Sequence, residues 1–241
     1  MAYYHPFSRG SAWQQGLDYF PRGPVNLFAR FISPNPITSA NSVQRFPSIH
    51  PTAFLGPFTS VIGDVHISDQ VFVAPTATLR ADEGTPFFIG SSSNIQDGVI
   101  LHGLANQHVQ VSNKSYSIYI GNRASIAHGA IIHGPCLIED DVFVGFKAIV
   151  FNAHIGQGSY ISNDALLTNG VRLAPNRFVP PGAHIDTQAK ADSLGSVPKD
   201  AEELAEQVIR VYSEFPPSYD AMFGTRRCSC GIAYNHEKLL R

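Results

Sequence analysis

Residues 120–150 read IGNRASIAHGAIIHGPCLIEDDVFVGFKAIV and carry an aliphatic residue at every sixth position. A period of six fits neither a helix nor an ordinary hairpin strand, but it is typical of a solenoid with three-sided coils. We therefore predict an all-β fold, a left-handed parallel β-helix of hexapeptide repeats with about seven coils over residues 49–190, followed by a C-terminal α-helix. The aliphatic positions of the whole repeat are Ile49, Leu55, Val61, Ile67, Val73 and Leu79; Ile89, Ile95 and Leu101; Ile120, Ile126, Ile132, Ile138, Val144 and Val150; and Ile155, Ile161, Leu167, Leu173, Val179 and Ile185.

Two other positions of the repeat are restricted. The fourth residue after the aliphatic is small or β-branched, as at Ala77 and Ala124, which suits a crowded corner. Glycine often follows the aliphatic directly, as at Gly90 and Gly121. The alternative fold is a β-sandwich of short strands, but its strand spacing would not stay locked at six residues.

Segments outside the repeat divide the chain further. Residues 1–48 are rich in proline and lack periodicity, so we expect an extended N-terminal arm. Residues 198–213 change to a helical period, with Leu204, Val208 and Val211 on one stripe that should pack along the prism. Residues 214–241 are expected to be a tail, and residues 81–88 and 104–117 interrupt the repeat as loops.

The composition limits the function classes. The 241 residues have a formal net charge of −2, which favours neither nucleic acid nor an anionic membrane as a partner. No apolar run approaches 18 residues and the first residues lack a secretory pattern, so we expect no membrane span and no signal peptide. Three cysteines are too few for a disulfide framework, which favours a cytoplasmic location.

Two histidines fall in the same place on the repeat. His102 directly follows the inward Leu101, and His133 directly follows the inward Ile132. If residues 104–117 form a loop that leaves the coil and rejoins it without changing the repeat, Ile132 stacks on Leu101 in the next coil. Stacked strands lie about 4.8 Å apart, so both imidazoles could reach one zinc ion.

His128 sits differently, two residues after Ile126 and on another side of the prism. It cannot easily face the same ion in its own chain, but a neighbouring prism related by a three-fold axis could supply it. The repeat thus predicts an intersubunit site with two histidines from one chain and one from the next. The alternative is that all three are surface histidines.

Four motifs carry a family resemblance: Arg80-Ala-Asp82-Glu83, Asn94-Ile-Gln96-Asp97, His102-Gly103, and the run from His128 to Pro135. Over roughly residues 49–212 the chain resembles the γ-class carbonic anhydrases, especially the carbonic anhydrase-like N-terminal domain of the carboxysome scaffold protein. The resemblance implies a homotrimer that interconverts CO2 and bicarbonate with zinc, or Fe²⁺ or Co²⁺ in some members, held by the three histidines.

The resemblance also implies roles for neighbouring residues. Arg80 and Asp82 match an intersubunit ion pair, and Asp97 matches an acid that holds its neighbours in place. The family positions that orient water and substrate are occupied in this chain by Glu83, Asn94 and Gln96. The chain departs from the family at two positions: Ala105 replaces a glutamate proton shuttle, and Tyr212 replaces an asparagine on the C-terminal helix. Proton export would then use Glu83, His108 or water.

Other functions stay open at this point. A scaffold protein of the carboxysome type, located in the carboxysome and bound to its components, would keep the fold with weak or no activity. A hexapeptide-repeat acyltransferase would share the coil but would not need three converging imidazoles. Cys228 and Cys230 allow a redox switch, because the carboxysome relatives use C-terminal cysteines in a disulfide, although C-x-C is too short for an easy bridge.

Overall fold

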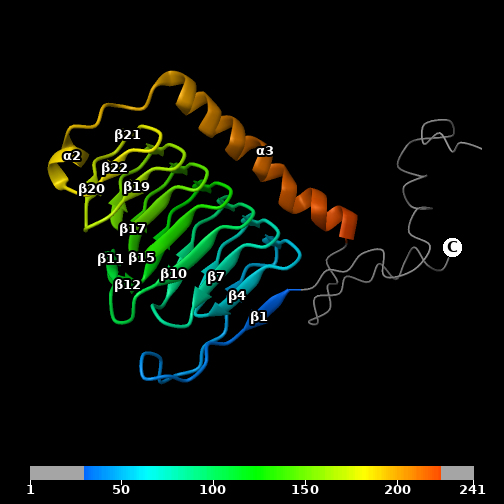
Figure 1. Ribbon diagram of the computed structural model, residues 1–241. Helices are drawn as coiled ribbons and strands as arrows, with labels where there is room; N and C mark the ends of the chain where they lie inside the picture. The colour runs from blue at the N-terminus through cyan, green and yellow to red at the C-terminus, as the bar shows by residue number, and fades with distance from the viewer. Residues whose placement is uncertain (1–29, 224–241) are drawn as a thin grey trace, which may run out of the picture.

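The computed structural model describes residues 30–223, which form a three-sided parallel solenoid with one long helix laid against it (Figure 1). The fold is the left-handed β-helix that the repeat predicts. The predicted redox residues Cys228 and Cys230 and most of the predicted tail lie outside the described residues, as do the first 29 residues of the predicted arm.

The first face of the prism carries the strands on which the predicted site depends. It holds eight stacked strands in the described part of the chain, one more than the seven or so coils predicted, because Phe31–Ser33 pairs in parallel with the strand at Ser60–Gly63. Within the predicted extended arm of residues 1–48, Phe31–Ser33 thus forms a strand of the prism. The strands are β1 (Phe31–Ser33), β4 (Ser60–Gly63), β7 (Thr78–Ala81), β10 (Ile100–Gly103), β15 (Ile131–Ile138), β17 (Ile149–Ile155), β19 (Leu166–Leu167) and β22 (His184–Ile185).

The other two faces complete each coil. Strands β15 and β17 turn the corner from the first face to the second without a break. The second face holds β2 (Ser48–Ile49), β5 (Val65–Ile67), β8 (Phe87–Ile89), β13 (Ile118–Ile120), the ends of β15 and β17, and β20 (Arg172–Leu173). The third face holds β3 (Phe54–Leu55), β6 (Phe72–Val73), β9 (Asn94–Ile95), β14 (Ser125–Ile126), β16 (Phe143–Val144), β18 (Tyr160–Ile161) and β21 (Phe178–Val179).

The core consists of the aliphatic residues of the repeat. All of them are buried except Ile49 at the first turn, which is partly exposed. The third residue after an aliphatic usually has a left-handed backbone, as at Arg123 (φ 55°) and Lys147 (φ 56°). This conformation turns the chain sharply at each corner, so that the next aliphatic points inward again.

Helix α3 (Lys199–Phe223) covers the third face. The predicted helix of residues 198–213 was too short, because α3 continues through Pro216 and Pro217. Aromatic packing on the prism offsets the loss of helical hydrogen bonds there: the rings of Tyr219 and Phe54 stack with centroids 4.6 Å apart. A short helix, α2 (Gln188–Asp192), closes the far end of the prism.

The packed stripe of α3 differs from the predicted one. Val208 packs as expected, but Leu204 and Val211 are exposed, so that part of the prediction was wrong. Neither α2 nor α3 has the length and apolar character of a membrane-spanning helix. The residues of α3 that pack against the prism are Ala201, Ala205, Val208, Tyr212, Phe215 and Tyr219.

The two interruptions of the repeat lie beside each other on the structure. Residues 104–117 form a hairpin of β11 (Val109–Val111) and β12 (Lys114–Tyr116). In the loop between β7 and β8, the Gly84 N–H donates to the Gly103 carbonyl at 2.9 Å. Both insertions therefore leave the first face next to β10, the strand that carries His102.

The glycines that follow the aliphatics allow the coils to stack closely. A Cβ on Gly90 would lie 2.5 Å from the carbonyl carbon of Gly121 in the next coil. We expect Gly90→Ala to lower the free energy of unfolding by about 1–3 kcal/mol through overpacking. Denaturant unfolding measures this, with Gly195→Ala as the control, because no atom lies within 4 Å of a Cβ there. Equal stability of the two variants would contradict the stacking argument.

Candidate metal centre

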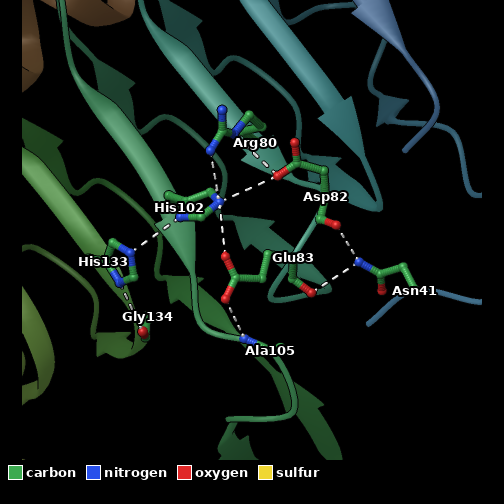
Figure 2. Close-up of polar contacts among 8 residues, drawn as sticks. All are labelled: Asn41, Arg80, Asp82, Glu83, His102, Ala105, His133 and Gly134. Carbon is green, nitrogen blue, oxygen red and sulfur yellow. Dashed lines mark hydrogen bonds and ion pairs between the residues drawn. The ribbon is translucent and has the colours of Figure 1, made fainter. Parts of the chain in front are cut away.

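The predicted register between β10 and β15 is the one observed. His102 pairs with His133 and Leu101 pairs with Ile132 across the parallel ladder. The two imidazoles therefore project side by side from the first face, with ring centroids 5.2 Å apart and an interplanar angle of 70°. Figure 2 shows both rings with their neighbours.

The facing nitrogens of these rings have a separation that suits a tetrahedral metal ion. Nδ1 of His102 lies 3.2 Å from Nε2 of His133, and in the protomer alone this contact is a hydrogen bond between the rings. Two zinc–nitrogen bonds of about 2.0–2.1 Å at the tetrahedral angle place the nitrogens about 3.3 Å apart. The pair thus fits two ligand positions of a zinc ion with little movement.

The surroundings of His102 favour a neutral imidazole, the form that binds metals. The pKa of His102 is lowered, chiefly by burial and next by the positive charge of Arg80, while Asp82 opposes the shift. His133 has its Nδ1 3.3 Å from the Gly134 carbonyl. A proton on Nδ1 donated to that carbonyl leaves the lone pair of His133 on Nε2, facing His102.

Arg80 and Asp82 contact each other within one protomer, with Nε and Oδ1 3.2 Å apart. Asp82 Oδ1 also lies 3.4 Å from Nε2 of His102, and Arg80 Nη2 lies 3.2 Å from that nitrogen. The same carboxylate oxygen is buried without a hydrogen bond of good geometry in the protomer. The intersubunit ion pair stays a prediction, for which this oxygen is an available acceptor.

Glu83 lies on the other side of His102. Its Oε2 is 3.8 Å from His102 Nε2, and its Oε1 accepts from the Ala105 N–H at 3.2 Å. His108, the other predicted proton route, lies beside the hairpin with Nε2 2.9 Å from the Thr85 carbonyl. The structure thus gives Glu83 a direct place beside His102, and the proton-transfer roles of both residues stay predictions.

His128 stands at a different corner, after β14 on the third face. Its Nδ1 lies 2.9 Å from Oδ2 of Asp97, the acid that is predicted to hold its neighbours in place. Its ring stacks on Phe146 with centroids 5.4 Å apart. These contacts fix the ring from two sides and leave Nε2, the atom away from Asp97, for a ligand.

Asn94 and Gln96 lie at β9 on the third face, where His128 follows β14, and not on the first face with His102. Asn94 Nδ2 donates to Ser125 Oγ at 2.8 Å, and Gln96 Nε2 donates to Asn94 Oδ1 at 2.9 Å. All three side chains are buried beside β9 and β14. Sequence reasoning missed Ser125, although it stands one coil beyond Asn94 at the same position of the repeat.

Tyr212, the predicted contribution from the C-terminal helix, packs on the third face. Its ring meets Phe72 edge-on at 5.5 Å, and burial raises the pKa of its phenol, with a further contribution from the negative charge of Asp97. Tyr212 thus belongs to the aromatic cluster with Phe54 and Phe72, and its contribution to the site stays a prediction.

The predicted site residues thus fall into two groups in one protomer. Within residues 30–223, no three histidine, cysteine, aspartate or glutamate side chains converge to hold a metal ion. We call the groups the two-histidine half, consisting of Arg80, Asp82, Glu83, His102 and His133, and the one-histidine half, consisting of Asn94, Gln96, Asp97 and His128.

Comparisons with known proteins identify the family of the chain. The chain is 40% identical over 179 residues to a carbonic anhydrase from Methanosarcina thermophila, covering 70% of this chain and 72% of that protein. The chain belongs to the γ-class carbonic anhydrase family. It is also 44% identical over 172 residues to the carboxysome assembly protein CcmM of Nostoc sp., covering 71% of this chain and 31% of that protein. A second CcmM, from Synechococcus elongatus, is 43% identical over 175 residues.

This γ-class family member spans about a third of the length of those carboxysome relatives, at 31% and 32%. No family model matches the chain. Among solved structures, a candidate acetyltransferase from Bacillus cereus aligns with a TM-score of 0.64 at 21% identity, over 80% of this chain and 98% of that one. A hexapeptide transferase family protein from Anaplasma phagocytophilum aligns with a TM-score of 0.61 at 22% identity, over 78% and 98%. These structures share the fold.

Cys136 lies three residues after His133 but is not available as a ligand. Its side chain is fully buried, and its Sγ contacts the His133 carbonyl at 3.1 Å. Burial raises the pKa of the thiol to about 12. Cys136 is therefore a core residue.

We expect Cys136 to be unreactive in the folded protein. In a Cys228→Ser, Cys230→Ser variant, the disulfide reagent DTNB at pH 8 should label no thiol until denaturant is added, because the reactive thiolate is scarce and inaccessible. Absorbance at 412 nm measures the released chromophore. Rapid labelling of one thiol in the native variant would contradict the buried position.

Proposed function

We propose that this chain is a zinc-dependent carbonate dehydratase that hydrates carbon dioxide reversibly to bicarbonate, and that it works as a homotrimer with an active site at each subunit interface. His102 and His133 of one protomer and His128 of the next would hold the metal. Fe²⁺ or Co²⁺ could occupy the same three-imidazole site. The paired nitrogens of His102 and His133 are the single observation on which the proposal rests.

The separation of the two halves supports a shared site. A zinc ion on the two-histidine half finds no third protein ligand among residues 30–223 of its own protomer, and the one-histidine half presents a ring held by Asp97 and Phe146. Because the halves lie on different faces, their meeting requires a heterologous interface, and such an interface closes into a ring when the rotation allows it. Three copies of a three-sided prism satisfy this condition.

Exposed apolar side chains lie beside both halves of the predicted site and support their burial in an interface. Ile100, Ile149, Phe146 and Phe151 are exposed in the protomer, and Phe151 pairs with His133 in the ladder. The Phe151 ring meets His133 edge-on with centroids 5.2 Å apart. Apolar groups in this density around polar ligands are typical of protein interfaces.

When bound, zinc supplies the Lewis acidity that makes a hydroxide nucleophile available near neutral pH. The chain's own residues would prepare this site. Burial and Arg80 keep His102 neutral, and the Gly134 carbonyl fixes the tautomer of His133. The Gln96 amide, anchored through Asn94, would orient a substrate oxygen without adding charge. Glu83 would accept and release the proton that hydration produces.

The similarity to CcmM favours a second candidate, a carboxysome scaffold with weak or no activity. In that case the chain would be located in the carboxysome and bind its components. A carbonate dehydratase would be equally compatible with a cytoplasmic location. Ala105 in place of the family's glutamate shuttle is the feature of this chain that favours slow turnover.

Stopped-flow measurement of CO2 hydration separates the two candidates. We expect the zinc-loaded protein to hydrate CO2 and His102→Ala to fall to the buffer rate, because one of three ligands is lost. His184→Ala is the matched control, since His184 lies on the first face several coils away. Zinc bound at full stoichiometry with no rate above buffer would favour the scaffold and overturn the enzyme proposal.

Mixing variants tests the shared site. His128→Ala should weaken zinc binding in every site by more than about 100-fold, a larger loss than the removal of an outer partner causes. Refolding a mixture of His102→Ala and His128→Ala chains should restore about one site per mixed trimer, because one interface then joins two intact halves. Zinc content and CO2 hydration report the recovery. Failure of the mixture to recover either would contradict a site shared between chains.

A further inference from the structure

Asn41 connects a segment outside the repeat to the two-histidine half. It lies in the N-terminal strap, defined as residues 34–47, which joins β1 to β2. Its side-chain Nδ2 donates to the main-chain carbonyl of Asp82 at 2.7 Å and to that of Glu83 at 3.0 Å (Figure 2). The residue is only 8% exposed, so these bonds are sheltered from water.

The two bonds fix the geometry of a turn. One NH2 group has two hydrogens, and here both are used on consecutive carbonyls. Two adjacent carbonyls can face one nitrogen only in a restricted backbone conformation, so Asn41 holds the near end of the loop after β7. The Gly84 N–H, bonded to the Gly103 carbonyl at 2.9 Å, holds its far end.

The same turn carries both carboxylates that lie beside His102. Asp82 Oδ1 is 3.4 Å and Glu83 Oε2 is 3.8 Å from His102 Nε2. A backbone rotation at these residues would therefore move both carboxylates relative to the ring. Asn41 itself makes no contact with His102 and can act only through the turn.

The strap has its own supports, which present Asn41 to the turn. The Asn41 N–H donates to Thr38 Oγ1 at 3.1 Å, and the Thr38 N–H donates to the Asn41 carbonyl at 2.9 Å. At the base of the strap, Asn35 is 3% exposed and its Oδ1 accepts from the Arg45 N–H at 2.8 Å. Arg45 in turn lies 3.6 Å from Asp64 on the prism.

We propose that Asn41 is a positioning residue that sets the orientation of His102 for metal binding through the Asp82–Glu83 turn. This inference rests on the proposed function, because it concerns the same site. The strap thereby helps to position the site, although it contributes no metal ligand. Asparagine is suited to this role, since an aspartate of the same shape would turn acceptor oxygens toward two carbonyls.

The test compares Asn41→Asp with Ile37→Ala, a control in the same strap whose side chain is 69% exposed. Zinc affinity is measured by competition with a chromophoric chelator, and secondary structure is monitored by circular dichroism. We expect Asn41→Asp to weaken zinc binding about tenfold, as loss of an outer partner does, while the protein remains folded. At saturating zinc, kcat should fall and KM for CO2 should stay within about twofold.

A second background shows whether the turn carries the effect. In a chain that already has Asp82→Asn and Glu83→Gln, Asn41→Asp should change zinc affinity by less than about twofold, because interacting residues are not additive. Should Asn41→Asp unfold the protein, Asn41→Ala in the same two backgrounds gives the same comparison without the added charge.

The outcomes separate this inference from the proposed function. Wild-type zinc affinity and kcat in both folded Asn41 variants would overturn the inference alone. An equal loss in Ile37→Ala, or a full tenfold loss in the doubly substituted background, would also overturn it. Zinc binding without CO2 hydration in the wild type would overturn the enzyme proposal and leave the affinity test valid. Absence of zinc binding in the wild type would overturn both.

Discussion

The parallel ladder between β10 and β15 is the constraint on which the site depends. Main-chain hydrogen bonds set the spacing of adjacent coils, and the buried contact between Leu101 and Ile132 sets their register. A slip of one residue would turn His102 inward, against an apolar core that cannot stabilise it. Folding of the solenoid and pairing of the two rings are therefore the same event, which explains why a rigid repeat suits a site that must hold two nitrogens 3.2 Å apart.

In the proposed trimer, the division of the site between faces would give the assembly a chemical role. The half with Asp97 and His128 is ordered by contacts within its own protomer, and the half with His102 and His133 is ordered by its ladder. Neither half has enough ligands alone among residues 30–223. Metal binding would then favour the assembled state, and assembly would in turn bury the apolar surface around the rings. Stability, association and activity are linked in such an arrangement.

The sequence predicted the features that follow from the six-residue period. The period alone determines which residues point inward, and with the extrusion of residues 104–117 it places His102 beside His133. Features set by tertiary contacts were harder to predict. Helix α3 runs ten residues past its predicted end, through Pro216 and Pro217, because Tyr219 stacks on Phe54. No sequence pattern pointed to a role for Asn41 at the site, since it lies in a non-periodic segment and contacts the backbone of residues about 40 positions away.

Anomalous X-ray diffraction at the zinc edge, on crystals of the zinc-loaded protein, measures where the ion lies relative to the chains. The account predicts one peak at each interface of a three-fold assembly, bonded at about 2.0–2.1 Å to His102 and His133 of one protomer and to His128 of the neighbouring protomer. A peak whose protein ligands all come from one chain, or a monomer with His128 facing solvent, would contradict it.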